Sequence, residues 1–477
     1  MTIQTRAAWL FGAVLSAAIA APVHAQPADG RLPSTTEPAR SALRSAMYES
    51  QNLRPALART HAAAAITADS QFGLARVYQT VLAAGMTPAA REAAIGRQLG
   101  AMGSATAAEV LLALYWREAA AGRGPAAAPI LKAASDLVPN DAEIAYMYGN
   151  TQQVGRSATE QVASLRTFLE RFPAHAAAHN QLAYTLWRAG DPEGSLAAVQ
   201  QYVRYAPEHP NSHDSYADIL LLLGRGAEAI PHVEREIELD PDFPGAYTKL
   251  GSIQLTMGNV REARAHFVNA AGKATTPADR IEVANWQAAT HVYEGNARGA
   301  LQDIMRVAET ARTEKMSGEL ALAYDRAALI DAYIGDRKAV SAHLAAAEAA
   351  TTTPNQKATY QSHAAIALSR IGRTQEASAA ASQFAASAGA DVNVVNSLTA
   401  IIALDSKDYP AAEAAIGKLT EPDVLTKALR AELMLRTGRT AEGQALRREV
   451  LASSVKLDGN PPVDFLALVG RMRADKL

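Results

Sequence analysis

The sequence of 477 residues contains no cysteine. This absence excludes a disulfide framework, a cysteine nucleophile and lipid attachment through cysteine. Aromatic residues are scarce, at 6%, whereas alanine is abundant, as expected for closely packed helices. Charge of one sign does not dominate either, because 46 basic and 48 acidic residues give a net charge of −2. The sequence therefore lacks the basic footprint that general nucleic-acid binding requires.

The N-terminal apolar run is short. It occupies residues 7–21 after a single basic residue, Arg6, and falls short of the ~20 residues that a membrane-spanning helix needs. Val23-His24-Ala25 then forms a small-x-small cleavage pattern before Gln26. These features predict a signal peptide at residues 1–25, a periplasmic or secreted protein, and no stable membrane insertion after cleavage. An uncleaved membrane anchor is the alternative.

A period of 34 residues organises the region from about residue 108 to residue 275. It appears in three chemically different columns, one of prolines, one of very small residues and one of glycines. A fixed period in this range is typical of a solenoid, in which each unit buries its apolar face by stacking on the next. The columns are Pro139, Pro173, Pro207 and Pro241; Gly149, Ala183, Ala217 and Gly251; and Gly190, Gly224 and Gly258.

One unit, residues 176–207, shows what is repeated. Leu182 and Leu186 share one helical face. Gly190 then suits a left-handed helix end, and Asp191 with the proline after it suits the start of another helix. A second apolar stripe runs to Pro207, which ends the unit. The pattern predicts a helical hairpin whose two helices approach closely at the column of very small residues.

These features resemble the tetratricopeptide repeat, which also has an early alanine in the second helix, as at Ala229 and Ala263. The resemblance implies an all-α fold, a right-handed superhelical solenoid of stacked helical hairpins, and a role in protein binding. Several positions depart from the family pattern. These departures affect how tightly the helices are expected to pack and not the expected fold. They are Gln161 and Ser195 for the early alanine, Tyr202 and Glu236 for a later small residue, and His179 and His213 for the usual tryptophan.

The rest of the chain is divided by composition and by drift of the period. We predict a flexible linker at residues 26–40, N-terminal helical repeats at 41–275, degenerate repeats at 276–453 and a C-terminal capping segment at 454–477. In the degenerate part, turn glycines are expected at Gly295, Gly335, Gly372 and Gly438. The long gap before Gly438 predicts one further hairpin in residues 393–419, with its turn near Lys407.

Candidate chemical motifs are few. His175 with His179, and His209 with His213, are spaced i, i+4 as in some metal sites. The two pairs are 34 residues apart, which favours a structural role in equivalent places, and a metal site is the alternative. Ser453 and Lys456 match an S-x-x-K spacing without the companion motifs of serine acyl-enzymes. We therefore expect no catalysis, no cofactor and no metal. Glu234 and Glu236 are expected on solvated helix faces.

The remaining candidate is a surface. In stacked hairpins the first helices line a common concave wall, and their non-core asparagines and tyrosines are suited to bind an extended peptide. We predict a non-catalytic exported scaffold whose groove binds a protein or peptide. The alternatives are a solvated face without ligand, an accessory factor in cell-envelope biogenesis such as polysaccharide export or outer-membrane assembly, and an enzyme in the C-terminal half. The predicted groove residues are Tyr146, Asn150, Asn180, Tyr184, Asn211, Asp214, Asp218 and Thr248.

Overall fold

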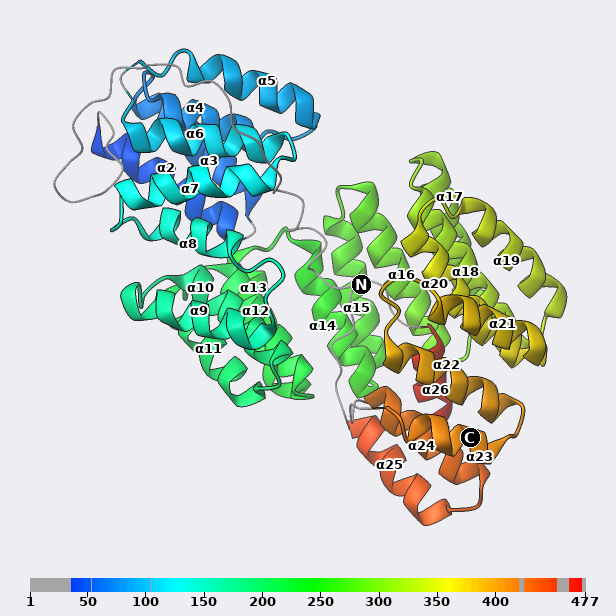
Figure 1. Cartoon of the computed structure of the whole chain (residues 1–477). Coiled ribbons are helices and arrows are strands. Elements are labelled where there is room, and N and C mark those ends of the chain that lie inside the picture. The colour runs from blue at the N-terminus through cyan, green and yellow to red at the C-terminus, as the bar shows by residue number, and fades with distance from the viewer. Residues whose placement is uncertain (1–35, 53, 104, 420–423, 453–462, 474–477) are drawn as a thin grey trace. The chain divides into compact units, whose positions relative to one another are not determined.

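The computed structural model describes residues 36–52, 54–103, 105–419, 424–452 and 463–473, which form 25 helices and no strand (Figure 1). The chain divides into two compact units, Met1–Ile219 and Leu220–Leu477. The division falls inside helix α12, which spans Pro210–Leu222. Within each unit, helices that follow one another pack as hairpins, and the hairpins stack. The predicted all-α solenoid of stacked hairpins is confirmed.

The first unit consists of five hairpins followed by the start of α12. Tyr184 of one first helix and Asp218 of the next lie close enough to form a hydrogen bond, as expected where first helices of consecutive hairpins are neighbours. The hairpins are α2 (Glu37–Gln51) with α3 (Pro55–Ala68), α4 (Gly73–Val81) with α5 (Pro88–Leu99), α6 (Ala107–Ala120) with α7 (Gly124–Leu137), α8 (Ala142–Thr151) with α9 (Ala158–Arg171), and α10 (Ala176–Arg188) with α11 (Pro192–Tyr205).

The second unit begins within α12, continues through α13 (Gly226–Leu239) and contains six further hairpins and a last helix, α26 (Val463–Arg473). Its first helices contact one another along the series, for example α18 with α20 and α20 with α22. The hairpins are α14 (Pro244–Met257) with α15 (Val260–Lys273), α16 (Pro277–Tyr293) with α17 (Ala297–Thr313), α18 (Ser317–Ile334) with α19 (Arg337–Ala350), α20 (Pro354–Arg370) with α21 (Thr374–Ala385), α22 (Val392–Asp405) with α23 (Tyr409–Ile416), and α24 (Val424–Arg436) with α25 (Thr440–Ala452).

The turns follow the chemistry of the sequence. Gly190 adopts a φ of 78°, a left-handed conformation that costs glycine little and ends α10 before Asp191 caps α11. The hairpin expected in residues 393–419 is present as α22 and α23, and Lys407 takes the left-handed position in its turn with a φ of 63°. The drifting period therefore conceals hairpins of the same design.

The column of very small residues lies where the helices of a hairpin meet. Ala183 and Ala217 have no exposed surface, and a Cβ added to Gly251 would lie 2.5 Å from Cε1 of Phe267. Ser195, which replaces the usual alanine, is buried and donates a hydrogen bond of 2.8 Å to the carbonyl of Ala183. Gly149 is the exception, because no atom lies within 4 Å of an added Cβ.

Three expectations need correction. The predicted linker extends to residue 40, but α2 begins at Glu37, because Thr36 caps it and Pro38 occupies its first turn. Glu236 is buried at 2% exposure, not solvated, because it occupies the small-residue position of its hairpin. The C-terminal segment contains the expected helix, but α26 packs on α16, α18 and α24 as well as on the final helix α25, so it does not only cap the last hairpin.

Residues 1–35 lie outside the described residues, and with them the predicted signal peptide and most of the predicted linker. In the part of the chain that the structure describes, no helix combines the length and the apolar character needed to cross a membrane.

Candidate functional site

The predicted groove residues fall into two columns that repeat every 34 residues. One column is carried by Tyr146 on α8, Asn180 on α10, Asp214 on α12 and Thr248 on α14. The other column lies four residues later on the same helices, at Asn150, Tyr184 and Asp218. Residues four apart share a helix face, so α8, α10 and α12 each contribute a pair of side chains and α14 contributes Thr248. Asn211 lies three residues before Asp214 and therefore extends the face of α12.

Side chains within a column form hydrogen bonds from one repeat to the next. The Tyr184 hydroxyl donates to Oδ2 of Asp218 at 3.1 Å in the first unit. In the second unit, the Thr248 hydroxyl lies 3.3 Å from Oε1 of Glu282, again 34 residues further along. The same hydroxyl also donates to the carbonyl of Gly245 at 2.8 Å. These contacts connect consecutive first helices through polar groups as well as through the apolar core.

Three of the eight residues are buried, contrary to the expectation that all would be non-core positions. Asp218 and Thr248 are 2% and 3% exposed, and each forms a hydrogen bond with a side chain 34 residues away, Tyr184 and Glu282 respectively. Tyr146 packs between Phe168 and His175, and its hydroxyl lies 3.3 Å from the carbonyl of Ala177. Burial raises the pKa of Tyr146 to about 12. These three side chains are therefore packing positions and do not line an open surface.

The other five residues are half-buried: Asn150, Asn180, Tyr184, Asn211 and Asp214. Asn211 donates to the Tyr202 hydroxyl at 2.9 Å, and Tyr184 is held by Asp218. Oδ1 of Asn180 differs, since this oxygen is buried and has no hydrogen-bond partner among the described residues. A buried acceptor without a donor is unfavourable, so Asn180 marks a place where an N–H group of a ligand would be stabilised.

A cluster at the edge of this face was not predicted from the sequence. Helix α2 brings Glu49 to His209, just before α12, although 160 residues separate them, and Asn52 at the end of α2 reaches Tyr202 on α11. Oε2 of Glu49 lies 3.2 Å from Nε2 of His209, and Oδ1 of Asn52 accepts a hydrogen bond of 2.6 Å from the Tyr202 hydroxyl. No local pattern indicates such contacts, because they depend on how the hairpins curve and not on the order of residues.

The paired histidines have structural roles. Nδ1 of His175 accepts the N–H of Ala178 at 3.2 Å, and Nδ1 of His209 accepts the N–H of Asn211 at 3.3 Å. A backbone N–H always donates, so the ring proton of each neutral histidine is on Nε2. That proton faces a glutamate in both cases, Glu143 at 3.5 Å and Glu49 at 3.2 Å.

The second histidine of each pair secures the proline that ends the preceding repeat. Nε2 of His179 lies 2.8 Å from the carbonyl of Pro173, and Nε2 of His213 lies 2.9 Å from that of Pro207. The Tyr247 hydroxyl makes the equivalent contact with the carbonyl of Pro241 at 3.1 Å. The departure from tryptophan in this column therefore provides a donor for a carbonyl at the join between repeats. In the described residues, no group of three or more potential metal ligands occurs.

The burial of His179 predicts a pH dependence. Desolvation lowers the pKa of His179 below the ordinary 6.5. The His179 imidazole is therefore protonated more readily in the unfolded chain than in the folded chain. The contribution to stability is therefore present above about pH 6.5 and is lost as the pH falls through that value. We expect urea midpoints of the first unit to decrease between pH 7.5 and pH 5.5, and to decrease less in His179→Phe. A control variant, His61→Phe, should keep the wild-type slope. Equal slopes for all three chains would contradict the prediction.

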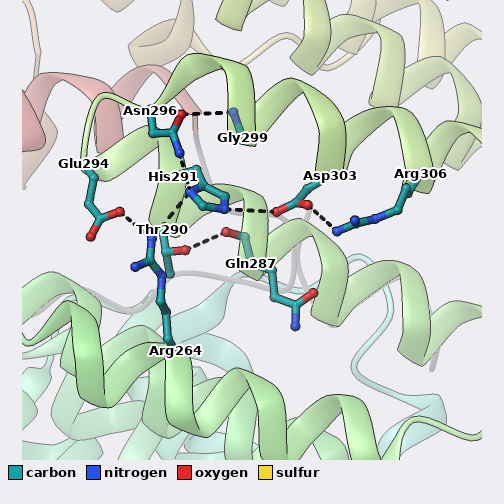
Figure 2. Close-up of polar contacts among 9 residues, drawn as sticks. All are labelled: Arg264, Gln287, Thr290, His291, Glu294, Asn296, Gly299, Asp303 and Arg306. Carbon is teal, nitrogen blue, oxygen red and sulfur yellow. Dashed lines mark hydrogen bonds and ion pairs between the residues drawn. The ribbon is translucent and has the colours of Figure 1, made fainter.

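A polar cluster in the second unit bears on the alternative of an enzyme (Figure 2). His291 on α16 lies 3.6 Å from Asp303 on α17, which is also ion-paired with Arg306. The hydroxyl beside the histidine, that of Thr290, donates to the carbonyl of Gln287 at 2.6 Å and does not point at the imidazole (Figure 2). This arrangement lacks a nucleophile bonded to its base, so the cluster serves to join the helices.

The central hairpins also match a known family. A family model described as tetratricopeptide repeat matches residues 162–210 and 180–244. These residues carry tetratricopeptide repeats. A crystal structure of MamA is 20% identical over 34% of this chain and 94% of its own, with a TM-score of 0.30. A thermophilic tetratricopeptide repeat protein of Thermus thermophilus is 22% identical over 38% of this chain and 98% of its own, with a TM-score of 0.32. No curated protein matches this sequence.

Proposed function

We propose that this tetratricopeptide repeat protein is a non-catalytic scaffold that binds a protein or peptide along the first helices of its central repeats. Asn180 carries the proposal, because its buried Oδ1 has no donor among the described residues while the neighbouring Tyr184 is bonded to Asp218. The main-chain N–H of an extended peptide would satisfy that oxygen. The half-buried Asn150 and Asp214 lie in the same two columns and extend the contact to the repeats on either side.

The test compares a triple variant, Asn150→Ala with Asn180→Ala and Asp214→Ala, with wild-type protein as bait in an extract of the producing cells. None of the three residues is in the apolar core, so thermal unfolding should remain close to that of the wild type. Captured partners should decrease at least tenfold, as expected for loss of polar anchors. Glu234→Ala on α13 is the matched control and should capture the wild-type amount. Equal capture by the triple variant would contradict the proposed site.

We propose further that the protein is exported. The support is Arg6, the apolar run at residues 7–21 and the small-x-small pattern that ends at Ala25. N-terminal sequencing of protein from the cell envelope should return Gln26 as the first residue. Recovery of Met1 would contradict cleavage and would favour an uncleaved membrane anchor. A narrower role in envelope biogenesis rests on the same N-terminal features and requires this result first.

A further inference from the structure

The last helix of the second unit is packed like a bound ligand. Helix α26 lies against α16, α18 and α24, which are first helices of three different hairpins, and against α25. We call the face formed by α16, α18, α24 and α25, with the end of α14, the α26 surface. The side chains of Leu466, Leu468, Val469 and Met472 are all buried. Such burial on several sides of a helix of 11 residues shows that the α26 surface wraps around it.

Backbone contact at Gly470 sets the fit. A Cβ added to Gly470 would lie 2.2 Å from the carbonyl oxygen of Tyr293, at the end of α16. Real Cβ atoms do not approach a backbone oxygen so closely, so a larger residue at this position forces the two helices apart. The α26 surface therefore selects a helix that has glycine at the point of closest approach.

Two arginines complete the contact. The Arg471 guanidinium lies 5.7 Å from the ring centroid of Tyr333 and 3.9 Å from Oε1 of Glu432, whose side chain has no exposed surface. The guanidinium of Arg473 donates to the carbonyls of Thr256 and Leu451, both at 3.2 Å. The α26 surface thus recognises an apolar helix that ends in Gly-Arg-x-Arg.

The charges of the α26 surface are also balanced by the hairpins themselves. Arg436 lies on α24, as Glu432 does, and pairs with Glu432 at 2.5 Å, much closer than Arg471 does. Arg370 lies 5.9 Å from the Tyr333 ring and so shares this ring with Arg471. Glu432 and Tyr333 keep these partners when α26 leaves, so loss of Arg471 does not leave Glu432 without a counter-charge. The polar part of the contact therefore does not oppose exchange.

We propose that the α26 surface is a helix-binding site, that α26 occupies it in cis, and that a partner protein's apolar helix ending in Gly-Arg-x-Arg replaces α26 there. The site is separate from the face of the central repeats, since it uses other residues. A tethered occupant acts at an effective concentration of about millimolar, so a partner competes only when its helix binds more tightly or is linked to a second contact. An isolated helix of this length is marginal in water, so the partner segment folds as it binds.

The test uses full-length protein and a fluorescent peptide with the sequence of residues 463–473. Gly470→Leu in the chain weakens the cis helix and leaves the α26 surface unchanged. Fluorescence anisotropy should show at least tenfold tighter peptide binding to Gly470→Leu than to wild type. Gly272→Leu is the control, because no atom lies within 4 Å of an added Cβ at this helical glycine, and it should bind like the wild type. A peptide carrying the same Gly470→Leu change should bind none of the chains.

The opposing results are equally specific. Equal affinity of wild type and Gly470→Leu, or binding of the altered peptide, would overturn the proposal. If Gly470→Leu does not fold, Arg471→Glu places a like charge beside Glu432 and should give the same gain in affinity. Failure of both to fold would make α26 part of the core and end the proposal. A doubled mass of wild type by light scattering, lost in Gly470→Leu, would assign the α26 surface to a second copy. Adding Asn180→Ala to the Gly470→Leu chain should leave peptide binding unchanged, which separates this site from the proposed function.

Discussion

Replacing Phe267 by alanine should lower the free energy of unfolding of the second unit by about 3–5 kcal/mol. The Phe267 side chain has no exposed surface, and its ring stacks on that of Trp286 with centroids 5.6 Å apart. It also fills the space beside Gly251, where a Cβ would meet the ring. The alanine variant leaves a cavity where the Phe267 ring was. The neighbouring helices cannot move in to fill this cavity without losing their other contacts, so most of the loss in stability should remain. Urea unfolding followed by circular dichroism measures the change.

The adjacent residue provides the control for this variant. Val268 lies on the same helix, α15, but is 63% exposed. Val268→Ala should therefore change stability by less than about 0.5 kcal/mol. Similar losses for the two variants would show that α15 does not present Phe267 to the core.

Removing the carboxylate of Asp405 should cost a comparable amount, about 3–5 kcal/mol. Asp405 forms an ion pair with Arg370, whose side chain is only 9% exposed, and accepts a hydrogen bond of 2.7 Å from the Ser369 hydroxyl. Asp405→Ala leaves the Arg370 guanidinium buried beside α22 without this counter-charge. The measurement is again urea unfolding, at pH 7.

Two comparisons identify the cause of that loss. The double variant Arg370→Met with Asp405→Leu removes both charges and should recover most of the stability. Asp242→Ala breaks an ion pair with Lys273 in which the Asp242 side chain is 84% exposed, and should change stability by less than about 0.5 kcal/mol. A loss in the double variant as large as in Asp405→Ala would contradict the interpretation, because no unpaired charge then remains.

The hairpins were predictable because their determinants are local. The spacing of Gly190, Gly224 and Gly258 follows directly from the repeat, and the turn at Lys407 is recognisable once a hairpin is expected between its neighbours. The predicted start of α2 is wrong because Pro38 lies in a stretch with the composition of a loop, although a proline in a first helical turn is favourable when Thr36 caps the helix. Local sequence therefore determines which residues are helical, and the predictions made from it are least accurate at the helix ends.

The candidate site was only partly predictable. Register placed Asn180 and Tyr184 on one helix face, since residues four apart share a face. It did not show that Asp218 and Thr248 are buried, because burial depends on side chains from other repeats, such as Tyr184 for Asp218 and Glu282 for Thr248. Contacts such as Asn52 with Tyr202, 150 residues apart, and the placement of α26 depend on how the hairpins stack, which no short segment encodes.

The position of α26 also affects how the second unit responds to force. An open array of repeats stretches easily, because each hairpin contacts only its neighbours and small rotations add along the series. Helix α26 contacts α16 near one end of this series and α24 and α25 at the other, so it acts as a brace between hairpins that are distant in sequence. A pull on α16 and α26 loads the contact of Gly470 with Tyr293 before it separates the hairpins between α16 and α25. The second unit should therefore require a high force for extension until α26 detaches, and a lower force for further extension afterwards.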